Sequence, residues 1–132
     1  MAETKAKILV VEDEEILLTA LREELETGGY TVEGAGDGVE GLEKTKSFKP
    51  NLILLDLLMP KMDGMEMLQK LKADAQTRDV PVVILTNLSD YGKISEALSL
   101  GAMDYLVKAN YKLEDLLEKV STVLARKAET ST

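Results

Sequence analysis

Hydrophobic residues follow two patterns that alternate along this chain. Short runs that are largely apolar are separated by longer segments in which apolar residues return every three or four positions. The first pattern is typical of strands buried on both faces, and the second is typical of helices with one buried side. The runs predicted to form strands are residues 7–11, 30–35, 51–56, 80–86 and 103–108, and each is followed by a segment of helical period.

Glycine and proline positions indicate where several of these elements begin and end. The first helical segment is followed by Gly28 and Gly29, which favour a helix C-terminus, and the fourth is predicted to end at Gly101. Pro81 stands near the beginning of the fourth strand, where a missing N–H is tolerated. The second strand alternates only in part, which suits the edge of a sheet.

Five strand–helix units predict an α/β fold. Strands that are apolar throughout and separated by helices imply a parallel sheet that is covered on both faces, with right-handed crossovers. The length of 132 residues suits one domain. We expect this domain to occupy residues 1–127 and to end in a short polar tail at residues 128–132.

Composition excludes several classes of function. With 45% apolar and 30% charged residues, the chain has the make-up of a globular protein, and we expect it in the cytoplasm without a membrane span or signal peptide. Cysteine and histidine are absent from the sequence, so disulfides and the usual soft-metal ligands are excluded. The net charge is -8 and no lysine or arginine cluster stands out, which argues against direct nucleic acid binding.

Charged and hydroxyl side chains stand at the predicted carboxyl ends of the strands. These residues are Glu12 and Asp13 after the first strand, Asp56 at the end of the third, Thr86 on the fourth and Lys108 on the fifth. If the chain reverses direction across the sheet between its first and third strands, the three carboxylates converge at the crevice there. Such carboxylates repel one another unless a proton or a cation compensates them. Mg²⁺, which prefers oxygen ligands, is the simplest compensation.

Each of these residues also has an ordinary structural role open to it. Asp13 could be the N-cap of the first helix, and the glutamates after it could complement the helix dipole. Thr86 is a common strand residue, Lys108 could be a surface lysine, and Tyr105 could simply pack with its hydroxyl in water. The methionines around residues 59–67 are interpreted as gap-filling side chains. The joint placement of the polar residues at strand ends favours a site.

Four segments, taken in order, resemble the receiver domains of bacterial two-component response regulators. They are "ILVVEDEE", "LLDLLMPKMDG", "VVILTN" and "GAMDYLVK", and together they span nearly the whole chain. The resemblance implies a doubly wound (βα)5 flavodoxin-like sandwich with a five-stranded parallel sheet in the order 2-1-3-4-5. Members of this family are themselves known examples of a crevice at such a chain reversal, so the expected convergence there does not support the resemblance independently.

The resemblance implies that Asp56 accepts a phosphoryl group from a phosphohistidine on a partner, either a sensor histidine kinase or a histidine phosphotransfer protein. The donor must be another molecule, because this chain has no histidine. Asp13 and Asp56 would bind Mg²⁺, with Glu12 acting directly or through water and the backbone carbonyl of Leu58 as a further ligand. Lys108 would add positive charge beside the transferred group.

The resemblance also implies a switch rather than an enzyme in the usual sense. The Thr86 hydroxyl would bind a phosphoryl oxygen, and Tyr105 would follow its inward movement, which alters a surface for a downstream protein target. We expect a monomer or weak dimer.

Two departures from the family pattern stand out. Ala109 follows Lys108 where receivers usually have a cis proline, and a cis bond before alanine costs about 3 to 4 kcal/mol. We therefore expect a strained or rearranged turn after Lys108. Leu58 and Leu88 occupy positions where many receivers carry polar side chains that orient the hydrolytic water. Apolar groups there predict slow self-dephosphorylation.

Three other functions share parts of the pattern. A flavodoxin-like FMN carrier needs a phosphate-binding loop after the first strand, where this chain has "EDEE". An aspartyl phosphatase would want a second acid at position 58, which is leucine. The strongest alternative is a receiver-like interaction adaptor that works without phosphorylation.

Overall fold

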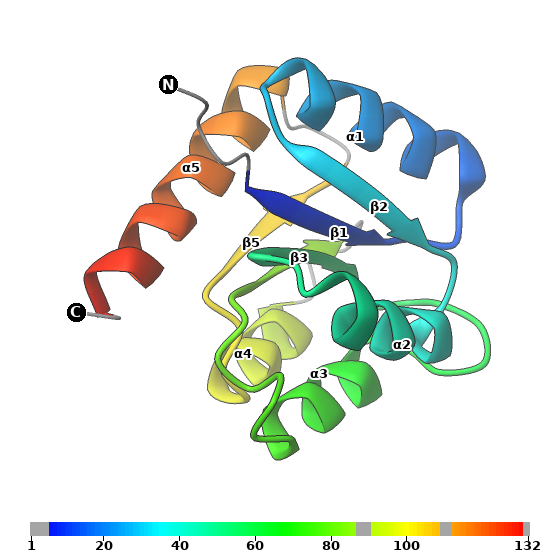
Figure 1. Ribbon diagram of the computed structural model, residues 1–132. Helices are drawn as coiled ribbons and strands as arrows, with labels where there is room; N and C mark the ends of the chain where they lie inside the picture. Colours follow the sequence, from blue (N-terminus) through cyan, green and yellow to red (C-terminus); the bar gives the residue numbers. More distant parts are fainter. Residues whose placement is uncertain (1–5, 87–90, 109–111, 131–132) are drawn as a thin grey trace.

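Strands and helices alternate along the whole chain (Figure 1). The computed structural model describes residues 6–86, 91–108 and 112–130. The strands are β1 (Lys7–Val11), β2 (Thr31–Ala35), β3 (Leu52–Asp56), β4 (Val82–Thr86) and β5 (Asp104–Val107). The helices are α1 (Glu15–Thr27), α2 (Gly38–Phe48), α3 (Gly64–Ala73), α4 (Tyr91–Ser99) and α5 (Leu113–Thr130).

The five strands form one parallel sheet in the order β2-β1-β3-β4-β5, which confirms the predicted fold class. The chain starts near the middle of the sheet, moves outward to β2 and then crosses back past β1 to β3. The reversal therefore lies between β1 and β3, where Val11 stands beside Leu55. The weakly patterned β2 is an edge strand, as its sequence predicts.

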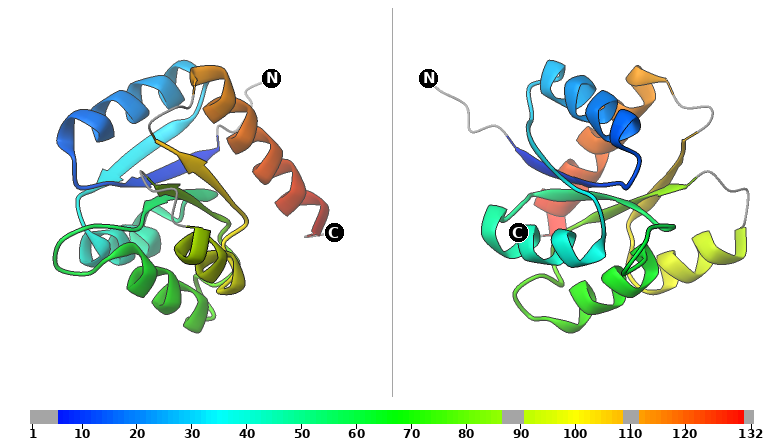
Figure 2. Two further views of the ribbon diagram at one scale, coloured as in Figure 1. Left: turned by 180° about the vertical axis from the view of Figure 1, so that it is seen from behind. Right: turned by 90° about the vertical axis from the view of Figure 1, so that its right-hand side faces the viewer.

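Helices cover both faces of the sheet. Helices α1 and α5 lie on one face, and α2, α3 and α4 lie on the other (Figures 1 and 2). Alternate residues of each central strand enter opposite cores, so Ile8 and Val10 pack towards α1 and α5 while Leu9 and Val11 pack towards α2 and α3. All five residues of β3 are buried. Burial on both faces explains why the central strands are apolar without alternation.

The helix ends agree with the sequence except at the start of α1. Gly28 is its C-cap, as predicted, but its N-cap is Glu14, whose side chain makes no capping hydrogen bond. The suggestion that Asp13 caps this helix is therefore wrong, and its carboxylate stays available at the strand end. Helices α2 and α3 do have side-chain caps, formed by Asp37 and Asp63.

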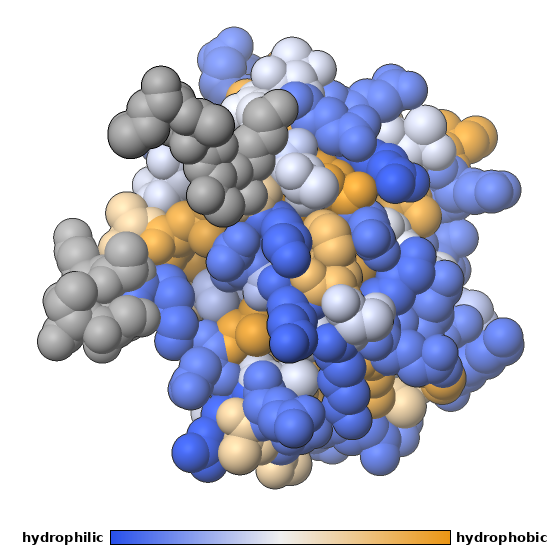
Figure 3. All heavy atoms as spheres, viewed as in Figure 1, coloured by the Kyte–Doolittle hydropathy of each residue, from blue (hydrophilic) through white to orange (hydrophobic). Residues whose placement is uncertain are grey.

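The surface is mainly hydrophilic on the face shown in Figure 3, with small separate apolar areas. Among the described residues, no helix combines the length and apolar character needed to cross a bilayer. The methionines of the segment after β3 pack against the core on the α2–α3 side, with Met67 fully buried, which agrees with the gap-filling interpretation.

Candidate functional site

The three acidic residues at the ends of β1 and β3 lie together. Glu12, Asp13 and Asp56 each place a carboxylate oxygen within 4.8 Å of the others. The parallel order of the strands brings this about, because β1 and β3 are neighbours and end at the same edge of the sheet. The structure thus gathers the three carboxylates that the sequence placed at strand ends.

These carboxylates differ in their access to solvent. Only 1% of Glu12 and 5% of Asp56 is exposed, whereas Asp13 is exposed. A buried carboxylate is unfavourable unless hydrogen bonds or a positive charge compensate it. The site therefore has two buried acids and one acid at its rim.

Lys108 reaches both buried carboxylates from the end of β5. Its ammonium contacts Oε1 of Glu12 and lies 3.2 Å from Oδ2 of Asp56, and only 5% of its side chain is exposed. The backbone N–H of Lys108 donates to the carbonyl of Thr86 at 2.8 Å, which fixes the end of β5 against β4. One lysine is thereby shared between two acids from separate strands.

The second oxygen of each buried carboxylate accepts from a backbone N–H two residues further on. The N–H of Glu14 donates to Oε2 of Glu12 at 3.1 Å, and the N–H of Leu58 donates to Oδ1 of Asp56 at 3.3 Å. Glu12 and Asp56 therefore have the same arrangement, with lysine on one oxygen and the following loop on the other. The sequence did not predict either backbone donor, because every residue except proline has a backbone N–H and its direction cannot be read from the residue type.

Burial dominates the electrostatics of the two acids. It raises the pKa of Glu12 from 4.5 to about 7, although Lys108 and the Glu14 N–H act in the opposite direction. Burial likewise raises the pKa of Asp56 against the lowering effect of Lys108. Burial lowers the pKa of Lys108 itself, but its contacts with Glu12 and Asp56 outweigh this and raise it overall. One ammonium thus compensates two buried carboxylates only in part.

This incomplete compensation fits a divalent cation. Oε1 of Glu12 is the one buried side-chain polar atom, among the described residues, that lacks a hydrogen bond of good geometry despite its ionic contact with Lys108. The cluster offers carboxylate oxygens from three residues, and hard cations such as Mg²⁺ prefer oxygen donors. The residues present therefore fit a Mg²⁺ site at the carboxyl ends of β1 and β3.

Gly64 lets the loop after β3 return close to Asp56. A Cβ at this position would overlap the backbone carbonyl oxygen of Asp56 and would lie 2.8 Å from Cα of Leu57. The N–H of Gly64 donates to the Leu57 carbonyl at 3.0 Å, which closes the loop. Next to it, Asp63 caps α3 by accepting from the N–H of Glu66 at 2.9 Å. The sequence showed an Asp-Gly pair here but not the close approach that requires the glycine.

The two residues expected to act as a switch lie on neighbouring strands. Thr86 is buried at the end of β4, and Tyr105 is half-buried on β5, where it is paired with Ile84. The turn that follows Lys108 lies outside the described residues, so the expectation of a strained turn at Ala109 is untested. Leu88 also lies outside them.

Leu58, two residues after Asp56, is 52% exposed. The proposed metal role of its carbonyl stays a prediction, as does slow self-dephosphorylation, which Leu58→Asn would accelerate.

Comparison with known proteins identifies the family. The family model described as "Response regulator receiver domain" matches residues 8–121 of this chain. The chain belongs to the response regulator receiver domain family. This confirms the resemblance seen in the four sequence segments. It also places the protein among signalling domains rather than in an ordinary enzyme family.

Receiver-domain relatives cover nearly all of this chain. It is 39% identical over 120 residues to the response regulator MprA of Mycobacterium ulcerans and 42% identical over 122 residues to the probable transcriptional regulator ycf27 of Porphyridium aerugineum. These matches cover 91% and 92% of this chain but 50% and 49% of the relatives. The chain thus spans about half the length of the curated relatives it matches.

Solved receiver structures share the whole fold. A CheY-like receiver domain protein from Methanospirillum hungatei superposes with a TM-score of 0.89 at 30% identity, covering 96% of this chain and 99% of that one. The chemotaxis protein CheY4 of Vibrio cholerae gives 0.85 at 32% identity, with 91% and 99% covered. Each superposition therefore covers more than nine tenths of this chain and nearly all of the solved chain.

Proposed function

We propose that this receiver domain acts in the cytoplasm as a phosphorylation-dependent switch, in which Asp56 takes a phosphoryl group from a phosphohistidine of a partner protein. A carboxylate oxygen of Asp56 bonds to phosphorus, and the bond from phosphorus to the imidazole nitrogen breaks, its electron pair returning to nitrogen. The product is an acyl phosphate at Asp56. The observation that carries this proposal is the convergence of Glu12, Asp13 and Asp56, two of which, Glu12 and Asp56, contact Lys108.

Asp13 and Asp56 are proposed to hold Mg²⁺, with Glu12 as a direct or water-mediated contact and the Leu58 carbonyl as a further ligand. Bound Mg²⁺ would supply positive charge for the oxygens of the transferred phosphoryl group. The exposed position of Asp13 gives an ion access from solvent, while the burial of Glu12 and Asp56 strengthens attraction to a cation.

Lys108 is proposed to hold the transferred phosphoryl group. Its ammonium is already 3.2 Å from Oδ2 of Asp56, the residue to which the group becomes attached. The backbone bond from Lys108 to Thr86 joins this lysine to the end of β4. Positioned charge of this kind is the main means by which proteins promote phosphoryl transfer.

Thr86 and Tyr105 are proposed to carry the change to a downstream protein target. The Thr86 hydroxyl would donate to a phosphoryl oxygen on Asp56, since register places Asp56 beside Leu85 at the same end of the sheet. Tyr105, on the adjacent strand β5, would then shift inward. The altered surface belongs to α4, β5 and α5 and would bind the target in one state better than in the other.

The phosphoryl donor is proposed to be a sensor histidine kinase or a histidine phosphotransfer protein. The sequence of this chain contains no histidine, so it cannot supply the phosphohistidine itself. Residues 1–127 are proposed as the receiver unit, which the family match at residues 8–121 supports. The phosphorylation-independent adaptor is the less favoured alternative, because it leaves the buried acid–lysine site without a role.

The test is phosphorylation by a small acyl phosphate in the presence of Mg²⁺, followed by intact mass measurement. The parent protein should gain the mass of one phosphoryl group, and Asp56→Asn should gain none. Asp79→Asn is a matched control, because it makes the same chemical change at an exposed residue away from the site. A parent protein that never gains mass, or an Asp56→Asn variant that gains as much, would favour the adaptor instead.

A further inference from the structure

Strand β2 forms one edge of the sheet, and part of its backbone faces away from β1. The N–H of Thr31 donates to the Ala6 carbonyl at 3.0 Å, and the carbonyl of Ala35 accepts from the N–H of Glu12 at 2.9 Å. Backbone groups of successive strand residues point in opposite directions, so Val32 and Gly34 face outward. Outward backbone groups at a sheet edge are a template for pairing with another strand.

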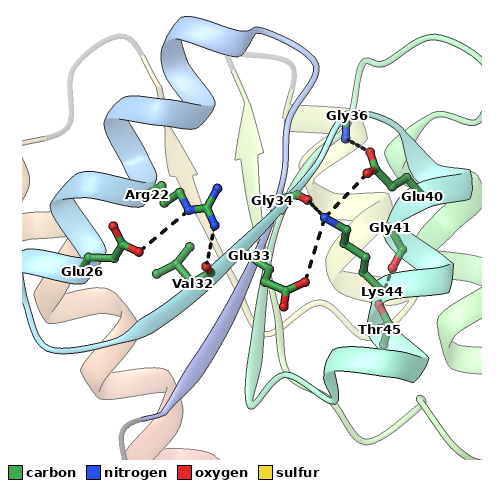
Figure 4. A network of polar contacts seen from close by, with 10 residues as sticks. All are labelled: Arg22, Glu26, Val32, Glu33, Gly34, Gly36, Glu40, Gly41, Lys44 and Thr45. Atoms are coloured by element: carbon green, nitrogen blue, oxygen red, sulfur yellow. Dashed lines mark hydrogen bonds and ion pairs between the residues drawn. The ribbon is translucent and has the colours of Figure 1, made fainter.

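Two cations occupy the outward carbonyls of this edge. The guanidinium of Arg22, on α1, donates to the carbonyl of Val32 at 3.3 Å. The ammonium of Lys44, on α2, donates to the carbonyl of Gly34 at 2.6 Å. Figure 4 shows the two side chains reaching β2 from opposite sides. Because α1 and α2 cover different faces of the sheet, the edge is enclosed from both.

Acidic side chains also lie beside both cations. Arg22 pairs with Glu26 at 3.8 Å, one turn further along α1. Lys44 pairs with Glu40 at 3.7 Å and with Glu33 at 4.0 Å (Figure 4). Glu40 also accepts from the N–H of Gly36 at 2.7 Å, just after β2. The contacts that close the edge therefore form two groups, one around Arg22 and one around Lys44.

The opposite edge of the sheet, at β5, is closed in a similar way. The N–H of Lys108 points towards β4, so the backbone of Tyr105, three residues earlier, faces outward. Its N–H donates to the Asp104 carboxylate at 2.8 Å, and its carbonyl accepts from Lys119 at 2.8 Å. Lys119 and Asp104 are themselves paired at 3.1 Å. A cation from a flanking helix thus occupies an outward carbonyl at both edges.

We propose that Arg22 and Lys44 close the edge of β2 to strand addition, and that the partner they exclude is a second copy of this chain. A closed dimer would pair the same strand of both copies about a two-fold axis, β2 against β2. The incoming strand would have to displace both cations from the carbonyls of Val32 and Gly34. This inference is independent of phosphoryl transfer, and it places partner binding away from the β2 edge.

The test opens the edge without changing net charge. The variant Arg22→Ala, Glu26→Ala, Glu40→Ala and Lys44→Ala removes two cations and two anions. The matched control carries only Glu26→Ala and Glu40→Ala, so it keeps both cations on the edge. Sedimentation velocity over a range of concentrations measures self-association. The quadruple variant should associate at least tenfold more tightly than the parent, and the association of the control should stay close to that of the parent. Hydrogen exchange at the Val32 and Gly34 amides should slow as the quadruple variant associates.

Two results would overturn the proposal. One is a quadruple variant that keeps a native circular dichroism spectrum and associates no more tightly than the parent protein. The other is a control variant that associates as tightly as the quadruple variant, because the effect would then come from the loss of the acids. If the four changes unfold the protein, the double variant Glu40→Ala with Lys44→Ala exposes the Gly34 carbonyl alone. A folded double variant that associates no more tightly than the parent also refutes the inference.

Discussion

Glu12 shows how one residue can be tuned by burial despite a cationic neighbour. It is almost fully buried and contacts Lys108, and its pKa is nevertheless raised to about 7. The lysine is shared with Asp56, whose pKa is also raised by burial. Near neutral pH the metal-free site therefore holds a proton in part of the molecules. A bound cation would release that proton, so metal affinity and pH are linked at this residue.

The pH dependence of stability follows from this raised pKa. The folded state holds the Glu12 proton more tightly than the unfolded chain, so this residue stabilises the metal-free fold below about pH 4.5 and loses that effect as pH rises through about 7. The loss amounts to roughly 3 kcal/mol for Glu12. The stability difference between Glu12→Gln and the parent is measured by urea unfolding with a chelator at pH 5 and at pH 8. Between these pH values the variant should gain roughly 2 to 3 kcal/mol on the parent. An equal difference at both pH values would contradict the raised pKa.

At the scale of elements, the loop between β3 and α3 sets the position of Asp56. The closest approach is at Gly64, where a Cβ would overlap backbone atoms, which cannot change rotamer as a side chain can. An added methyl group there would force the loop or the end of β3 to shift. The loop therefore couples the stability of the fold to the position of Asp56, the proposed phosphoacceptor.

Gly64→Ala should destabilise the protein by roughly 2 to 4 kcal/mol, because the new Cβ overlaps the Asp56 carbonyl. The matched control is Gly36→Ala, since a Cβ at that position would meet only Oε1 of Glu40 at 3.7 Å. Chemical denaturation of both variants measures the difference. Similar stabilities for the two variants would show that the loop relaxes easily around the extra methyl group.

The elements also show what sequence reasoning could predict. Strand β3 is evident from its sequence because an uninterrupted run of aliphatic residues is typical of a strand buried on both faces. The apolar run predicts the start of β4 two residues too early, because Val80 and Pro81 continue it although the paired strand begins at Val82. The sharing of Lys108 between two acids was beyond prediction, since it depends on side-chain reach across three strands.

At the scale of the whole molecule, the site and the cores lie on the same strands. β1 and β3 contribute apolar side chains to both cores and end in the acids of the site. The strands that position the acids are therefore among the most buried parts of the protein. Because a ligand that binds only the folded state raises its stability, cation binding at the site should be detectable in global unfolding.

Mg²⁺ should raise the unfolding free energy by about 2.7 kcal/mol when its concentration is one hundred times the dissociation constant. At one fixed Mg²⁺ concentration, the increase should be larger at pH 8 than at pH 6, because at the lower pH the ion competes with the proton on Glu12. Asp13→Asn should abolish most of it without disturbing the core, since Asp13 is exposed. Asp115→Asn, an exposed change on α5, is the control and should respond like the parent. An undiminished response of Asp13→Asn in thermal unfolding would mean that Mg²⁺ stabilises the fold from somewhere other than the three carboxylates.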